Sequence, residues 1–131
     1  MSPILGCGSD WTEWGSHCYK FFGEKLTWFD AQARCEKEGS HLASVHSGDE
    51  NQFLGTFQDS SGWWIGGNDL DTEGTWVWTD GTEWDYQNWS PGQPSTSYSN
   101  SDEHCLEFWA STFWNDVPCN NFQRGAIICK K

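Results

Sequence analysis

Four histidines are the side chains in this sequence best suited to acid–base catalysis or zinc binding near neutral pH. They stand at positions 17, 41, 46 and 104. His41 and His46 are separated by one residue more than the i, i+4 pair that binds zinc on the helix of a metalloprotease. No serine or cysteine stands in a recognisable nucleophile motif. We therefore expect the histidines to be surface or structural residues.

Carboxylates offer a second route to catalysis, because glycosidases use a pair of them as acid and as base or nucleophile. The candidates lie in the first half of the chain: Glu36, Glu38, Asp49 and Glu50. Helix-capping and solvent-facing roles account for these acids more simply. The sequence therefore predicts no catalytic residue and no enzyme.

The six cysteines stand at positions 7, 18, 35, 105, 119 and 129. None of them forms the Cys-x-x-Cys spacing of redox and zinc motifs. An even number of cysteines in a small acidic chain predicts a disulfide framework and a secreted, extracellular protein. Spacing alone leaves many pairings open.

Chain length, net charge and the lack of long apolar runs limit the number of domains and the kinds of binding partner. A length of 131 residues fits a single domain over residues 1–131. Seven Lys and Arg against 19 Asp and Glu give a formal net charge of −12, which repels phosphate backbones and anionic lipids and attracts cations. We expect no nucleic acid partner. No apolar run approaches the roughly 18 residues of a membrane helix, so no membrane insertion is expected, and Met1–Leu5 is too short for a signal peptide.

Two helices are predicted in the first half of the chain. Thr27 can cap a helix over Trp28–Glu38 that Gly39 ends. Ser47 and Glu50 form a capping box for a second helix, whose apolar face carries Phe53, Leu54 and Phe57. Before them, two close cysteines among aromatic residues in the first 22 positions indicate a stapled hairpin.

Short strands are predicted in the second half, over Trp63–Gly67, Thr75–Thr79 and Gly125–Lys130, with turn residues between them. The polar stretch between Trp89 and Asp102 is too long for an ordinary connection and leads into Glu103, His104 and Cys105. Long loops inside compact domains are often functional. The fold class expected is α+β, and for this loop a functional role is favoured over that of a disordered surface connection.

Eleven tryptophans, in a chain with few aliphatic residues, must supply much of the core. Those in strand-like or loop-anchoring positions are expected to be buried: Trp64, Trp76, Trp78, Trp89 and Trp114. Trp11, Trp14 and Trp63 are the candidates for a partner surface.

Several motifs carry a resemblance to a known family. They are the tetrad Trp64-Ile65-Gly66-Gly67, Glu73 and Gly74 before Trp76-Val77-Trp78, the pair Gln93-Pro94, and Trp114-Asn115-Asp116 just before Cys119. With the six cysteines, this pattern resembles a long-form C-type lectin-like domain from Cys7 to Cys129. The resemblance implies two helices, small antiparallel sheets, a long calcium-binding loop, and three disulfides: Cys7–Cys18, Cys35–Cys129 and Cys105–Cys119.

The resemblance also implies one calcium ion, which binds two neighbouring sugar hydroxyls directly. Its ligands, carried over position by position, are Gln93, Ser95, Glu103, Asn115 and Asp116. Calcium takes about six to eight oxygen ligands from such side chains and from backbone carbonyls, so the residue types agree. The same side chains would bind the sugar. Only two of them are carboxylates, which predicts weaker calcium binding than three would give.

The sugar preference in the resembled family follows the triplet around the loop proline. A Gln in first place goes with galactose-like sugars, so Gln93 implies galactose or N-acetylgalactosamine over mannose. Ser95 replaces the usual acid or amide with a hydroxyl, which departs from both patterns. Galactose-type sites often add an aromatic ring against the sugar. Tyr98, the only aromatic in the loop, is the first candidate. Trp109 is another candidate, although it and Phe113 fit packing roles better.

A second calcium position in some relatives would use Asp69 and Glu73 together with two further acids. Thr96 and His104 stand at those two places here. We expect this position to hold no calcium, because half of its carboxylates are missing.

One exposed sugar site binds weakly, so a homo-oligomer, such as a dimer, is expected to supply avidity. The alternative function is a non-sugar role of the same scaffold, either ice binding or protein recognition. Retention of Gln93, Glu103, Asn115 and Asp116 favours carbohydrate, and Ser95 favours the alternative.

Overall fold

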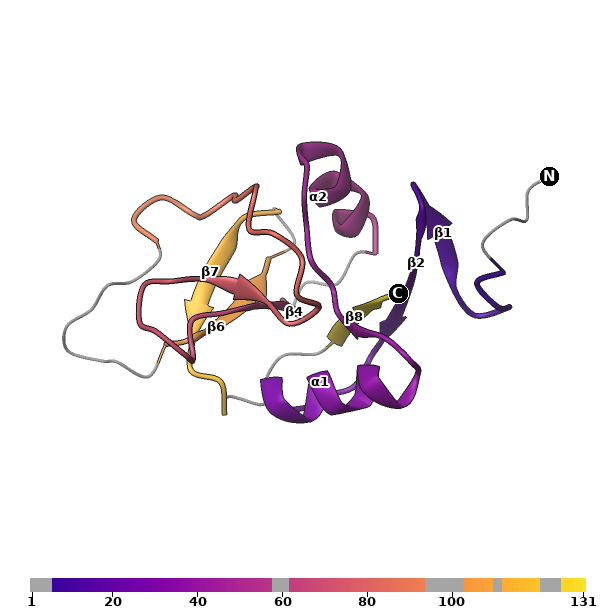
Figure 1. Ribbon diagram of the computed structural model, residues 1–131, viewed down its shortest axis with the longest axis horizontal. Coiled ribbons are helices and arrows are strands. Elements are labelled where there is room, and N and C mark those ends of the chain that lie inside the picture. The colour runs from indigo at the N-terminus through magenta and orange to yellow at the C-terminus, as the bar shows by residue number, and fades with distance from the viewer. Residues whose placement is uncertain (1–5, 58–61, 94–102, 110–111, 121–125) are drawn as a thin grey trace.

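The computed structural model describes residues 6–57, 62–93, 103–109, 112–120 and 126–131. Two helices and eight strands follow one another in these residues (Figure 1). In chain order the elements are β1 (Thr12–Trp14), β2 (His17–Phe22), α1 (Trp28–Lys37), β3 (His41–Leu42), α2 (Gly48–Gly55), β4 (Trp63–Asn68), β5 (Val77–Trp78), β6 (Cys105–Phe108), β7 (Trp114–Val117) and β8 (Ala126–Lys130).

The N-terminal hairpin is confirmed. β1 and β2 pair in antiparallel fashion, with Trp14 opposite His17 across the turn. Gly15 in this turn has a φ of 61°, a conformation that favours glycine. Cys7 is bonded to Cys18 and fixes the preceding segment to the hairpin.

Helix α1 begins where its cap predicts. The Thr27 hydroxyl accepts a hydrogen bond from the Asp30 amide at 3.1 Å, and the helix ends one residue before the predicted Glu38. Its buried face carries Trp28, Ala31 and Cys35. Cys35 is bonded to Cys129 on β8, so the helix is tied covalently to the sheet.

Helix α2 follows the Ser47 cap, whose hydroxyl accepts from the Glu50 amide at 3.0 Å. Glu50 Oε1 reaches back to accept from the amide of His46 at 2.8 Å. The capping role predicted for Glu50 is confirmed, and the residue is only 4% exposed. Phe57 lies beyond the end of the helix, yet it packs against the core as predicted.

The described strands form one connected eight-stranded sheet, in the order β1-β2-β8-β4-β6-β7, with β3 on β8 and β5 on β4. Most strand pairs are antiparallel, as predicted, while β4 and β8 pair in parallel. In Figure 1 β8, in the middle of the view, lies between α1 below it and α2 above it. The sheet therefore joins the N-terminal hairpin to the β6–β7 ladder that carries the predicted site.

Tryptophans fill the core as predicted. Trp64, Trp78 and Trp114 are buried, while Trp76 and Trp89 are half-buried and pack against the cluster that contains Trp78 and Trp114. The partner-surface role predicted for Trp63 is wrong. It is fully buried on β4 and stacks on Phe108, with ring centroids 4.9 Å apart. Trp11 and Trp14 are half-buried, and Trp14 stacks on Phe53.

Candidate functional site

The β6–β7 ladder positions two of the predicted ligands. Asn115 pairs with Glu107, and Asp116 pairs with Leu106. Glu103 stands two residues before β6 begins. The disulfide Cys105–Cys119 joins the start of β6 to the residues just after β7, which fixes this end of the ladder. Three of the predicted ligands are therefore carried by, or lie directly before, two paired strands.

The segment before Gln93 lies alongside β7. Trp114 donates its amide to the carbonyl of Asn88 at 3.0 Å, and Ser90 donates to the carbonyl of Trp114 at 2.9 Å. Gln93 closes the following turn by donating its amide to the carbonyl of Ser90 at 2.9 Å. The chain therefore brings the Gln93 turn to the strand that carries Asn115 and Asp116.

The side-chain oxygen of Gln93 is enclosed and has no hydrogen-bond partner among the residues that the structure describes. Burying an amide oxygen unsatisfied costs about 1–3 kcal/mol. A buried oxygen acceptor without a protein partner is suited to bind a cation such as calcium. This oxygen is the clearest sign of a ligand position among the described residues of the predicted site.

Asn115 is oriented by two neighbours. With the amide placed to satisfy both atoms, its oxygen accepts from the indole nitrogen of Trp109 at 2.5 Å and its nitrogen donates to the carbonyl of Trp114 at 3.3 Å. An amide oxygen has two lone pairs, so one remains for a cation. Asp116 is 4% exposed and Glu103 is half-buried.

Two of the predicted site residues, Ser95 and Tyr98, lie outside the described residues, as does Thr96. Of the aromatic candidates that are described, Trp109 is half-buried beside Asn115. Phe113 is 41% exposed, so the packing role expected for it is wrong.

The contacts that hold the base of the loop, to Gln87 and to the carbonyl of Thr112, were not predicted. Gln87 Oε1 accepts from the indole nitrogens of both Trp84 and Trp89, each at 3.1 Å. The carbonyl of Thr112 accepts from the side-chain nitrogens of Asn88 at 2.7 Å and Asn51 at 2.9 Å. Thr112 has a φ of 73°, which turns this carbonyl toward both amides. The two contacts to the carbonyl of Thr112 span 24 and 61 residues, so no local motif signals them.

Trp84 and Gln87 also line an open acidic pocket together with Asp85 and Tyr86. Nδ1 of His46 lies 2.6 Å from Asp85 Oδ1. This hydrogen bond lowers the pKa of the Asp85 carboxyl below its usual value. Burial raises the pKa of the Tyr86 hydroxyl. The pocket is aromatic and polar, but no sequence motif assigns it a ligand.

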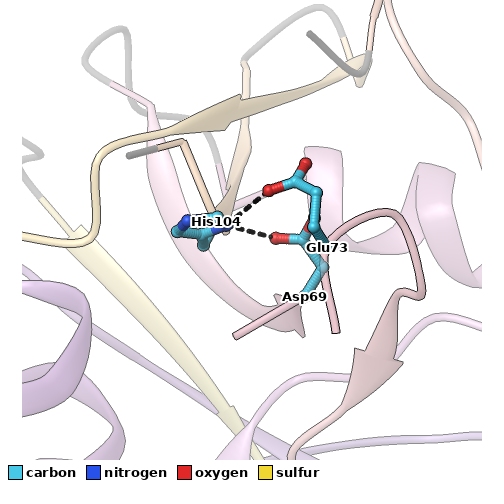
Figure 2. Close-up of side chains that lie close together, drawn as sticks. All are labelled: Asp69, Glu73 and His104. Carbon is cyan, nitrogen blue, oxygen red and sulfur yellow. Dashed lines mark hydrogen bonds and ion pairs between the residues drawn. The ribbon is translucent and has the colours of Figure 1, made fainter. Parts of the chain in front are cut away.

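A second cluster lies where β4 ends. Nδ1 of His104 is 2.9 Å from Asp69 Oδ1 and 3.3 Å from Glu73 Oε1 (Figure 2). Asp69 is buried, whereas the Glu73 side chain is 59% exposed. The structure thus brings together the two acids predicted for a second calcium position and the histidine that stands in place of an acid.

Comparison with known families gives one match over most of the chain. The family described as "Lectin C-type domain" matches residues 24–131. A protein described as "Lectin" from Pleurodeles waltl is 41% identical, with 95% of this chain and 77% of its own length covered. A "Galactose-specific lectin nattectin" from Thalassophryne nattereri is 34% identical over 95% of this chain and 80% of its own. A "C-type lectin mannose-binding isoform" from Oxyuranus scutellatus is 37% identical over 95% of this chain and 82% of its own length.

Solved structures also resemble the whole fold. A calcium-independent type II antifreeze protein superposes with a TM-score of 0.87 at 35% identity, covering 95% of this chain and 93% of its own. Similar folds thus carry sugar-binding and ice-related descriptions. Separately, neither helix among the described residues has the length and apolar character needed to cross a membrane.

Proposed function

This chain belongs to the C-type lectin domain family, and from that premise we propose that it binds carbohydrate through one calcium ion, with galactose or N-acetylgalactosamine preferred. The family and its relatives are lectins and antifreeze proteins, which bind ligands and do not catalyse reactions. The chain is therefore not an enzyme. Its three disulfides support the proposal that the protein is secreted.

The residues proposed to hold the ion share oxygen donors suited to calcium: Gln93, Ser95, Glu103, Asn115 and Asp116. The observation that carries the proposal is the enclosed, unpartnered Oε1 of Gln93. A calcium ion beside this oxygen would remove the cost of its burial. Two carboxylates among the five residues make the proposed site a weaker one than a three-carboxylate site.

When bound, calcium supplies open coordination positions for two neighbouring hydroxyls of a sugar. The side chains then fix the orientation of the sugar. The amide nitrogens of Gln93 and Asn115 can only donate hydrogen bonds, and the carboxylates of Glu103 and Asp116 can only accept them. A sugar hydroxyl that contacts one amide and one carboxylate therefore accepts a hydrogen bond from the amide nitrogen and donates one to the carboxylate.

The preference for galactose rests on Gln93, the first residue of the triplet, and on the galactose-specific relative. The mannose-binding relative shows that the family does not fix the sugar. Tyr98 and Trp109 are the rings proposed to contact the apolar face of the sugar. Because one such site binds weakly, we also propose that the protein acts as a homo-oligomer, with a dimer as the smallest unit.

Retention on immobilised galactose and, in parallel, on immobilised mannose tests the proposal. We expect retention on galactose in calcium and release by a chelator. Retention on mannose alone would overturn the sugar preference while keeping the calcium mechanism. Failure to bind calcium in a titration would overturn the mechanism itself.

A pair of variants sharpens this test. Gln93→Ala removes the unpartnered amide oxygen and should abolish retention on galactose. Gln52→Ala is the matched control, because Gln52 is an exposed amide on α2. Equal retention of the two variants would show that Gln93 is not a ligand.

Ice binding is the second candidate, favoured by the antifreeze protein that shares this fold at 35% identity. That relative is described as calcium-independent, so the two candidates differ in their response to a chelator. Thermal hysteresis that persists in a chelator, together with no retention on either sugar, would support ice binding over the lectin proposal.

A further inference from the structure

The cluster of Asp69, Glu73 and His104 offers three possible metal ligands, separate from the residues of the proposed calcium site. One ligand atom from each residue, two carboxylate oxygens and Nδ1 of the imidazole, lies within 4.8 Å of the other two. Both carboxylates face the same ring nitrogen (Figure 2). This arrangement differs from the solvated acids elsewhere on the surface, because it is built around a nitrogen donor.

The fold holds two of the three groups firmly. The backbone amide of Asp69 donates to the carbonyl of His104 at 3.0 Å, which fixes the two residues side by side. Asp69 Oδ2 accepts from the amide of Gly74 at 2.9 Å, and this bond leaves Oδ1 directed at the imidazole. The exposed Glu73 side chain can adjust to a ligand at little cost. The pair is preorganised, and the third donor is adaptable.

We propose that Asp69, Glu73 and His104 form a binding site for Zn²⁺. Zinc takes imidazole nitrogen and carboxylate oxygen together, whereas calcium takes oxygen ligands. Ligands about 2.0–2.1 Å from a tetrahedral zinc ion lie about 3.3–3.4 Å apart. The observed separations of 2.9 and 3.3 Å from Nδ1 are close to this value, so small movements admit the ion. Two carboxylates balance its charge, and zinc replaces the proton on Nδ1.

His104 also borders open space. It lines a pocket of about 260 Å³ together with Phe29, Leu70, Cys119 and Asn120. Cys119 is bonded to Cys105 and so offers no thiolate. Three protein ligands leave the fourth tetrahedral position for water or for a small ligand group.

The simpler alternative is that His104 only forms hydrogen bonds or an ion pair with the acids. The chain contains a matched comparison for this, since among the described residues His46 faces a single carboxylate, that of Asp85, at 2.6 Å. A histidine with one carboxylate lacks a third donor, so it should not retain zinc. The difference between the two histidines is therefore the number of donors, not the presence of an acid.

The test is a calorimetric titration of the folded protein with ZnCl₂. Saturating calcium is present throughout, so that sites with only oxygen ligands are already filled. The wild type should bind one zinc ion per chain. His104→Ala should weaken binding by more than about 100-fold, beyond the range typical for loss of an outer-shell partner. His46→Ala should leave zinc binding unchanged. No binding by the wild type, or equal effects of the two variants, would overturn the proposal.

Two further variants separate metal ligation from folding. Glu73→Gln changes an exposed side chain, so it should weaken zinc binding without altering the near-ultraviolet circular dichroism of the tryptophans. His104→Asp makes the donor set entirely oxygen, so zinc binding should fall while calcium binding at this position rises. Unchanged zinc binding in either variant would overturn the assignment. Neither result depends on sugar binding, so this proposal and the lectin proposal can fail separately.

Discussion

Nζ of Lys130 lies 2.6 Å from Glu50 Oε2, and both side chains are almost wholly buried. The contact joins the last strand to helix α2, 80 residues apart in the chain. The hydroxyl of Tyr19 donates to the same Oε2, and Lys130 also donates to the carbonyl and the hydroxyl of Ser44. A buried ion pair is stable in a fold only when its remaining polar atoms are satisfied, and here they are.

Replacing Lys130 with methionine should be strongly destabilising. The substitution leaves the Glu50 carboxylate buried without its cation, which costs about 3–5 kcal/mol of the free energy of unfolding. Urea denaturation followed by tryptophan fluorescence measures the loss. Lys25→Met, at an exposed position, is the control and should change stability little. Equal stability of the two variants would show that the ion pair is dispensable.

Tyr19 should make stability depend on pH in the alkaline range. Burial raises the pKa of its hydroxyl above the usual range, and the hydrogen bond to Glu50 adds to the effect. The unfolded chain loses this proton near pH 10 while the folded chain keeps it. Stability is therefore unaffected by this group below about pH 10 and falls above it, by up to about 1.4 kcal/mol per pH unit.

Unfolding of the wild type and of Tyr19→Phe, compared between pH 8 and pH 11, checks this dependence. The phenylalanine variant should be less stable at pH 8, because it loses the bond to Glu50, but should show a shallower decline. Parallel declines of the two proteins would assign the pH dependence to other groups, such as Tyr86, whose pKa burial also raises.

The helices could be predicted because their signals are local. Thr27 with Asp30, and Ser47 with Glu50, each place a hydroxyl within one turn of the amide that it caps. The strands β3, β6 and β7 were missed because they are short and exist only through pairing with distant segments. Burial of Glu50 could not be predicted for the same reason, since its cation comes from the other end of the chain.

The candidate site was predicted from the sequence only as a set of residue positions. The oxygen donors came from motif resemblance, which supplies positions but no contacts. The unpartnered oxygen of Gln93 and the bond from Trp109 to Asn115 depend on how separate segments meet. The left-handed backbone of Thr112 could not be expected either, because a β-branched residue disfavours that conformation.

The disulfide Cys105–Cys119 should matter for calcium more than for folding alone. Its closed loop spans 14 residues, so replacing both cysteines with alanine should cost about 3 kcal/mol of stability. The same change should weaken calcium binding, because the bond fixes the end of the ladder that carries Asn115 and Asp116. Calorimetric titration and thermal unfolding of the double variant measure the two effects.

The Cys7–Cys18 disulfide provides the control. It spans a similar 11 residues and lies in the N-terminal hairpin. Replacing both of its cysteines with alanine should lower stability by a comparable amount and leave calcium affinity unchanged at a temperature where both variants are folded. A loss of calcium affinity in both double variants would mean that general stability, and not the position of the β6–β7 ladder, governs the metal site.

Trp109→Phe tests how the site orients its amide ligand. The phenylalanine ring keeps an aromatic surface at this position but has no N–H to donate to the oxygen of Asn115. Without that bond the amide can rotate, so its oxygen no longer faces one fixed direction, and calcium affinity should fall by about tenfold, within the range that loss of an outer-shell partner costs. Calcium titration of the variant measures this.

The control for this variant is Trp11→Phe, which changes another half-buried tryptophan far along the chain, in the N-terminal segment. It should leave calcium affinity unchanged. Sugar retention at saturating calcium then separates two roles of Trp109. If the Trp109→Phe variant is retained on the sugar as well as the wild type at saturating calcium, the indole acts only by orienting Asn115. If retention stays low with calcium bound, the ring itself contacts the sugar, because loss of an oriented ligand alone would be compensated by a higher concentration of the ion.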